Sequence, residues 1–209
     1  MNYMGMPWGM WTLFAGSFQA QLTDVLGYNE QTAKAITRRA KAKYKEILSC
    51  LPEFEKGDRF KINLVGCAML GAFVLTMPER PNVDRLTEYY AKAMMTKPMR
   101  WFCRKSGEKK FTPQSVAGLQ AAAVLKAADR NPYSWNMDFY EYPDGGGYEA
   151  RFTKCGICVL MRELGLYDLT PALCRLDYTM SEAGGTADFR RQYTLASGGP
   201  YCDCGYKKK

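Results

Sequence analysis

The sequence of 209 residues contains no histidine. Histidine is the general base of Ser-His-Asp and Cys-His catalytic sites, so both kinds of site are excluded. The same absence removes the commonest zinc ligand and every metal site that contains histidine. Any chemistry must therefore use Cys, Asp, Glu, Lys, Tyr, Arg or backbone groups.

Long hydrophobic runs are also missing. The apolar segment at residues 62–77 is sixteen residues long and is interrupted by Asn63, whereas a transmembrane helix needs about 20 apolar residues. We interpret it as a helix buried inside a bundle. The N-terminal MNYMGMPWGMWTLF is apolar but has no basic region and no small-residue cleavage pattern, so it does not resemble a secretory signal. We expect a cytoplasmic protein without a membrane segment.

No stretch is low in complexity, and 47% of the residues are hydrophobic. This composition predicts one folded unit over residues 1–209, with a mainly helical part at 1–130 and a sheet- and cysteine-rich part at 131–209.

The formal net charge is +8, and three of these charges lie in the terminal tail 207–209. Because no arginine-rich arm is present, we do not expect a nucleic-acid partner. A charge of this size also attracts small anions. A small anionic substrate and a homo-oligomer are both compatible with this sequence.

Helical patterns separated by Pro and Gly fill the first two-thirds of the chain. Asn29, Asp58 and Asn82 are each placed to begin a helix as the N-cap residue. The most regular pattern covers residues 112–127, with Thr112 at the cap and Pro113 at the first position. Its apolar stripe consists of Val116, Leu119, Ala123, Val124 and Ala127.

The hydrophobic period changes after residue 131. Apolar residues alternate with polar ones on both sides of a DGGG turn, which is typical of a β-hairpin with one buried face. Two short helices are expected at 156–164 and 171–182, the second with Thr170 as its N-cap. Residues 188–208 indicate a second hairpin that turns at 198–200.

Together these elements predict an α+β fold. An N-terminal helical bundle would pack on a four-stranded antiparallel sheet formed by the two hairpins, with the two short helices between the hairpins.

Five of the eight cysteines lie in the last third of the chain: Cys155, Cys158, Cys174, Cys202 and Cys204. The CxxC spacing of the first two can bring both sulfurs to one side of a first helical turn. The last two are two residues apart in a strand and point to one face of the sheet. All five thiols can therefore converge.

Three interpretations of this cysteine cluster stay open. The thiols can fill a tight sheet–helix interface, line a catalytic pocket, or bind zinc or an iron–sulfur centre. Four-thiolate zinc sites present two CxxC pairs about fifteen to twenty residues apart, and only Cys155 and Cys158 match. A metal site is therefore the least favoured, and in a reducing compartment a disulfide scaffold is not expected.

Asp177 lies among Leu173, Leu176 and Met180 in the second predicted short helix. A carboxylate against a core face needs hydrogen-bond donors or takes a raised pKa. Arg190 or Arg191 on the following strand can supply such donors, and a structural ion pair explains the carboxylate as well as a catalytic role does.

The segments CGIC, LCRLDYTM, YTLASGG and YCDCGY resemble the L-2-amino-thiazoline-4-carboxylic acid hydrolase family. The resemblance is specific over residues 155–206 and looser over the N-terminal helices. The family pattern falls on Cys155, Cys174, Asp177, Arg190, Gly199, Cys202 and Asp203. The chain departs from that pattern at Cys204 and Gly205, where members often carry an aromatic and a basic residue.

The resemblance implies a cofactor-independent hydrolysis of 2-amino-thiazoline-4-carboxylate to N-carbamoylcysteine. Asp177 would act as the base, with Cys174 or Cys202 as covalent nucleophile or proton donor. Arg190 is expected to hold the substrate carboxylate. Three further residues are expected to bind the substrate: Cys155, Asp203 and Gly199.

Two other functions fit the same residues. Clustered cysteines can form a metal-binding or thiol-redox module, and the same pocket can bind a small acidic ligand without catalysis. The metal content of the purified protein distinguishes a metal-binding module from a hydrolase. Recovery of an unchanged ligand distinguishes a non-catalytic binding protein from a hydrolase.

Overall fold

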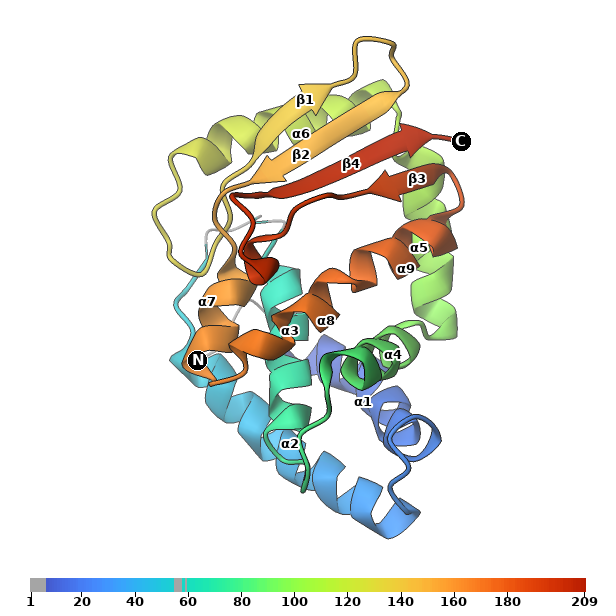
Figure 1. The fold of residues 1–209 in the computed structure, drawn as a ribbon, viewed down its shortest axis with the longest axis vertical. Coiled ribbons are helices and arrows are strands. Elements are labelled where there is room, and N and C mark those ends of the chain that lie inside the picture. Colours follow the sequence, from blue (N-terminus) through green and yellow to red (C-terminus); the bar gives the residue numbers. More distant parts are fainter. Residues whose placement is uncertain (1–6, 55–57, 59) are drawn as a thin grey trace. The chain divides into compact units, whose positions relative to one another are not determined.

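A computed structural model describes residues 7–54, 58 and 60–209 (Figure 1). It confirms the α+β class, with a mostly helical N-terminal part followed by a four-stranded antiparallel sheet. The chain forms two compact units: unit 1 comprises residues 1–96 and 157–173, and unit 2 comprises residues 97–156 and 174–209. A single folding unit over residues 1–209 stays a prediction.

Unit 1 is helical. It contains α1 (Pro7–Asp24), α2 (Glu30–Cys50), α3 (Lys61–Val74), α4 (Val83–Met94), all but the first residue of α7 (Gly156–Glu163), and the short 3₁₀ turn η1 (Tyr167–Leu169). The predicted caps of α2 and α4 are confirmed, because Asn29 and Asn82 each accept a hydrogen bond from the backbone N–H three residues on.

The core of unit 1 is aromatic and aliphatic. The ring of Phe18 packs against Phe73, Tyr89 and Tyr90. Helix α3 is buried without interruption from Leu64 to Val74, which is why its sequence is apolar on every side. No described helix is long and apolar enough to cross a membrane.

The predicted cap of α3 is wrong. Asp58 accepts a hydrogen bond from the backbone N–H of Phe60 at 2.8 Å, so its carboxylate holds the turn that precedes the helix. The N-cap position belongs to Phe60, which makes no side-chain cap bond.

Unit 2 contains the sheet. Its helices are α5 (Lys97–Lys109), α6 (Pro113–Ala127) and α9 (Leu176–Gly184), and its strands are β1 (Asp138–Glu141), β2 (Gly147–Phe152), β3 (Ala187–Arg190) and β4 (Cys202–Lys208), with the 3₁₀ turn η2 (Leu195–Ser197) before β4. The strand order is β1-β2-β4-β3, so the two predicted hairpins meet through β2 and β4.

The register gives the sheet one apolar and one polar face. Cys204 pairs with Ala150 and Cys202 with Phe152, while Tyr206 pairs with Tyr148 on one side and Phe189 on the other. These residues share a face, and alternate positions present charged groups to the opposite face.

Helices α5 and α9 pack against each other beside the sheet (Figure 1). Their closest approach is at Gly107 and Gly184, where a Cβ added to Gly107 would overlap the Gly184 carbonyl oxygen. The Thr186 hydroxyl also donates to the Gly107 carbonyl at 2.9 Å. Only glycine at 107 permits this separation of the two backbones.

Two helix predictions need correction. The helix expected at 171–182 is divided at Arg175 into α8 (Thr170–Cys174) and α9. Thr170 is helical and its buried hydroxyl has no hydrogen-bond partner among the described residues, so it does not cap. In α6, which begins as predicted with Thr112 capping Ser115, Val124 is 76% exposed and the only buried residue is Lys126.

Candidate active site

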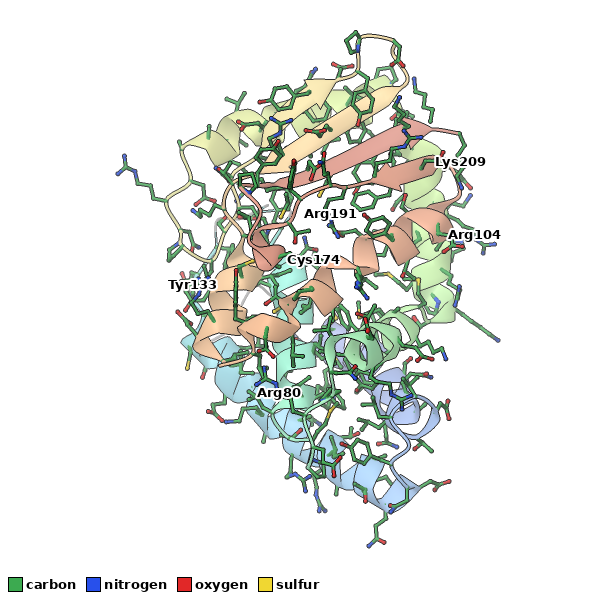
Figure 2. All side chains as sticks on the ribbon, viewed as in Figure 1. Arg80, Arg104, Tyr133, Cys174, Arg191 and Lys209 are labelled. Atoms are coloured by element: carbon green, nitrogen blue, oxygen red, sulfur yellow. The ribbon has the colours of Figure 1, made fainter. Side chains whose placement is uncertain are left out.

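The candidate site is built around the break between α8 and α9. The Nη1 of Arg191 donates to Asp177 Oδ2 at 2.7 Å, and its Nη2 donates to the Cys174 carbonyl oxygen at 2.6 Å. One guanidinium, directly after β3, therefore holds the last residue of α8 and the first turn of α9. Figure 2 labels Arg191 and Cys174 at this point of unit 2.

The guanidinium of Arg191 is enclosed. Only 5% of its side-chain surface is exposed, and it lies 5.3 Å from the ring centroid of Tyr178 and 5.2 Å from that of Phe189. The charge of Asp177 raises the pKa of Arg191 despite its burial. A permanent positive charge thus stands beside the carboxylate.

Asp177 lines a small cavity of about 120 Å³ in unit 2. Its side chain keeps 44% of its surface accessible, and the rest is covered. This partial burial raises the pKa of Asp177, and the positive charges of Arg191 and Lys110 oppose that shift. A carboxylate of raised pKa that is open to a cavity has the properties of a general base.

Lys110 was not predicted to belong to a site. It follows α5, a helix that the sequence pattern did not indicate, and it lines the same cavity as Asp177. Its ammonium lies 3.7 Å from the ring centroid of Tyr206. Burial lowers the pKa of Lys110, and the charge of Asp177 opposes the shift.

Four of the five clustered cysteines belong to unit 2: Cys155, Cys174, Cys202 and Cys204. Cys158 lies on α7 and belongs to unit 1. The thiols of Cys155 and Cys202 are near enough to Cys174 to raise its pKa electrostatically. The structure therefore groups four of the five thiols near the Asp177–Arg191 pair, and the convergence of Cys158 with them stays a prediction.

Three of these thiols, those of Cys174, Cys202 and Cys204, have raised pKa values. Burial raises the pKa of Cys174 to about 12 and also raises the pKa of Cys202 and Cys204. The Cys202 sulfur accepts a hydrogen bond from the Leu195 backbone N–H at 3.2 Å, which opposes part of its shift. All eight cysteines are free of disulfides.

Arg190 does not lie with Asp177. It is exposed at the end of β3 and lines an open groove of about 420 Å³, together with Tyr178, Glu182 and Asp188. Neighbouring residues of a strand point to opposite faces of the sheet. This alternation explains why Arg191, and not Arg190, contacts Asp177.

Gly199 lies in the connection between β3 and β4, and Asp203 is the second residue of β4. The Asp203 carboxylate accepts hydrogen bonds from the backbone N–H groups of Gln192 at 2.9 Å and Tyr193 at 2.6 Å. The Gly199 N–H donates to the Thr194 carbonyl at 2.9 Å. Both residues shape the backbone that follows Arg191, and their role in substrate binding stays a prediction.

Gly205 is one of the two positions at which the chain departs from the family pattern. A Cβ at this residue would lie 2.5 Å from the Tyr142 hydroxyl and 3.3 Å from the Arg190 carbonyl oxygen. The Tyr142 side chain therefore fills the space that a larger residue at 205 would occupy.

Metal ligation has little support in this arrangement. In the part of the chain that the structure describes, no three Cys, Asp or Glu residues are grouped so as to hold a metal ion. The thiols of unit 2 share their surroundings with the guanidinium of Arg191, and a cation repels a metal ion placed beside it.

Comparison with known proteins gives one positive result. No curated protein and no solved structure shows significant similarity to the chain. A family model for L-2-amino-thiazoline-4-carboxylic acid hydrolase matches residues 63–206, which include Asp177, Arg191, Lys110 and the cysteines of unit 2. The match covers more than half of the sequence, and the chain therefore belongs to the L-2-amino-thiazoline-4-carboxylic acid hydrolase family.

Proposed function

We propose that this protein hydrolyses the ring of 2-amino-thiazoline-4-carboxylate to give N-carbamoylcysteine. Membership of the hydrolase family carries the proposal. The local arrangement supports it, because Asp177 combines a raised pKa with access to a cavity of about 120 Å³.

The reaction adds water to the ring carbon that is bonded to two nitrogens and to sulfur. Asp177 takes a proton from the attacking water as its oxygen bonds to that carbon. The carbon–sulfur bond then breaks, the sulfur takes a proton, and the carbon becomes the carbonyl of a urea. One water is consumed, and no oxidant, reductant or cofactor is needed to balance the step.

The high pKa of these thiols limits what cysteine can do in this reaction. A thiol with a pKa of about 12, as at Cys174, is a poor nucleophile because the thiolate is the reactive form. It is also too weak an acid to protonate a departing thiolate, whose ordinary pKa is about 8.5. We therefore assign Cys174 or Cys202 as a hydrogen-bond donor to the departing sulfur, with no covalent intermediate on the enzyme, and the carboxyl of Asp177 returns to that sulfur the proton that it took from water.

Arg191 supports the base in this scheme. Its bond to Asp177 Oδ2 fixes the carboxylate and leaves Oδ1 to face water, since no described residue bonds that atom. Because Arg191 stays protonated, it also limits how far the pKa of Asp177 can rise. We assign Arg191 as a positioning residue that acts through Asp177.

The decisive experiment is an assay of the full-length protein with 2-amino-thiazoline-4-carboxylate, with N-carbamoylcysteine followed by mass spectrometry. We expect product from the wild type and a severe loss in Asp177→Asn. Product at the same rate in both proteins would contradict the assignment of the base. A substrate recovered unchanged despite saturable thermal stabilisation would replace the hydrolase with a binding protein.

A further inference from the structure

We propose that Lys110 is the residue that binds the substrate carboxylate, and so determines the specificity of the site for a small zwitterion. The inference rests on the proposed function, because it assumes that the cavity beside Asp177 receives the substrate.

The first support is the unusual situation of the Lys110 ammonium. It lies over the face of the Tyr206 ring at 3.7 Å, and the cavity beside it is also lined by Cys103, Ser106 and Asp177. Among the described residues, no carboxylate lies within ion-pairing distance of Lys110. Asp177 acts on Lys110 by its charge within the same cavity but makes no salt bridge with it. A half-buried cation without a salt bridge is costly, and an anionic ligand reduces that cost.

The second support is charge complementarity. The cavity presents the ammonium of Lys110 and the carboxylate of Asp177 along one lining. The protonated substrate carries a positive amidine and a negative carboxylate on one five-membered ring, separated by a single ring nitrogen. A small cavity with one fixed charge of each sign can therefore contact both ends of the substrate at once.

The third support is the position of the other cations. Arg191 already donates to Asp177 and to the Cys174 carbonyl. Arg190, which the sequence favoured for the carboxylate, lines the open groove beside β3 and not the cavity of Asp177. Lys110 is the lysine or arginine that lines this cavity.

The test compares two ligands that differ only in the carboxylate. The aromatic analogues 2-aminothiazole-4-carboxylate and 2-aminothiazole cannot be opened as the thiazoline is, so calorimetry measures binding alone. We expect Lys110→Met, which keeps an apolar stem over Tyr206, to bind the acid about 10- to 100-fold more weakly and 2-aminothiazole with unchanged affinity. Lys110→Arg should recover part of the loss.

The matched control is Lys109→Met, because Lys109 is the exposed neighbour at the end of α5 and its charge should not matter. Equal weakening of both ligands by Lys110→Met would show that the side chain acts through packing, and would overturn the inference. So would unchanged binding of the acid, or no binding of the acid to the wild type. If Lys110→Met selectively loses binding of the acid but the wild type hydrolyses nothing, the Lys110 assignment would be retained and the proposed function removed.

Discussion

Units 1 and 2 bury different kinds of side chain. Unit 1 encloses rings and aliphatic chains such as Phe18, Phe73 and Leu70, while its ion pairs, including Lys34 with Glu30, lie at the surface. Unit 2 encloses a guanidinium, a half-buried ammonium and several thiols around the Asp177 carboxylate. An apolar core only stabilises, whereas buried ionisable groups cost free energy and gather at functional sites. The difference favours unit 2 as the location of the chemistry.

Asp177→Asn is the sharpest way to test that contrast, and it should have the largest effect. Loss of a general base lowers kcat/KM by about 10²- to 10⁴-fold, measured on 2-amino-thiazoline-4-carboxylate. The control is Asp168→Asn in unit 1, whose carboxylate pairs with Arg80 at an exposed site, and which should keep full activity. Similar activity in the two variants would remove the distinction between the units.

The apolar core of unit 1 can be broken at Leu70, which is completely buried in α3. Leu70→Ala should lower the free energy of unfolding by about 2–5 kcal/mol, because it removes contacts and leaves a cavity. In unit 2, Leu125→Ala on α6 should change it by less than about 0.5 kcal/mol, since Leu125 is 76% exposed. Urea denaturation measures the free energy of unfolding of both variants. Equal losses of stability in the two would mean that another surface covers Leu125 of α6 in solution.

The packing of unit 2 is tested at Gly107. A methyl group there meets the Gly184 backbone, so Gly107→Ala should force α5 and α9 apart and cost about 2 kcal/mol in thermal or urea unfolding. Gly118→Ala in α6 is the matched control, because nothing lies within 4 Å of its added Cβ. That variant should gain about 0.5–1 kcal/mol from better helix propensity. An unchanged free energy of unfolding in Gly107→Ala would show that α5 and α9 can separate at this contact without cost.

The pH dependence of kcat/KM should reflect the ionisation of Asp177 and Lys110 in the cavity. We expect this to be the smallest of the four effects predicted here. Asp177 must be ionised to accept a proton, so its raised pKa moves the acid limb of kcat/KM above the range usual for Asp, with about a tenfold fall per pH unit below it. Lys110 must be protonated to bind an anion, so its lowered pKa moves the alkaline limb below the range usual for Lys.

The variant Lys110→Met assigns the alkaline limb. It should flatten that limb and move the acid limb to higher pH, because the charge of Lys110 lowers the pKa of Asp177. A rate that is independent of pH down to the usual pKa of an exposed Asp would contradict the assignment of Asp177 as the base.

Local signals in the sequence predicted much of the fold. The caps at Asn29 and Asn82, the period-two pattern of the first hairpin and the turn residues of the second depend on neighbouring residues only. Helix α5 had no such signal, because its buried residues are only Cys103 and Gly107 and charged residues surround them. Periodicity also predicted a stripe on α6 but could not show whether another element covers it.

The site was predicted in part. Spacing along the chain was enough to bring the thiols of unit 2 to the neighbourhood of Asp177. It could not choose between Arg190 and Arg191, because that choice depends on which face of the sheet each side chain takes where β3 ends. Lys110 was missed since it is 67 positions from Asp177 in the sequence, and only the contact of α5 with α9 brings the two residues to one cavity.

The two hydrogen bonds that Arg191 donates have a consequence for redesign. The same guanidinium sets the charge beside Asp177 and anchors the carbonyl of Cys174, so replacing it changes acidity and backbone path together. Lys110 contacts a ring and open space. Efforts to move the working pH or the preferred ligand should begin at residue 110, where the charge of the cavity can be altered without removing a side chain that anchors the backbone.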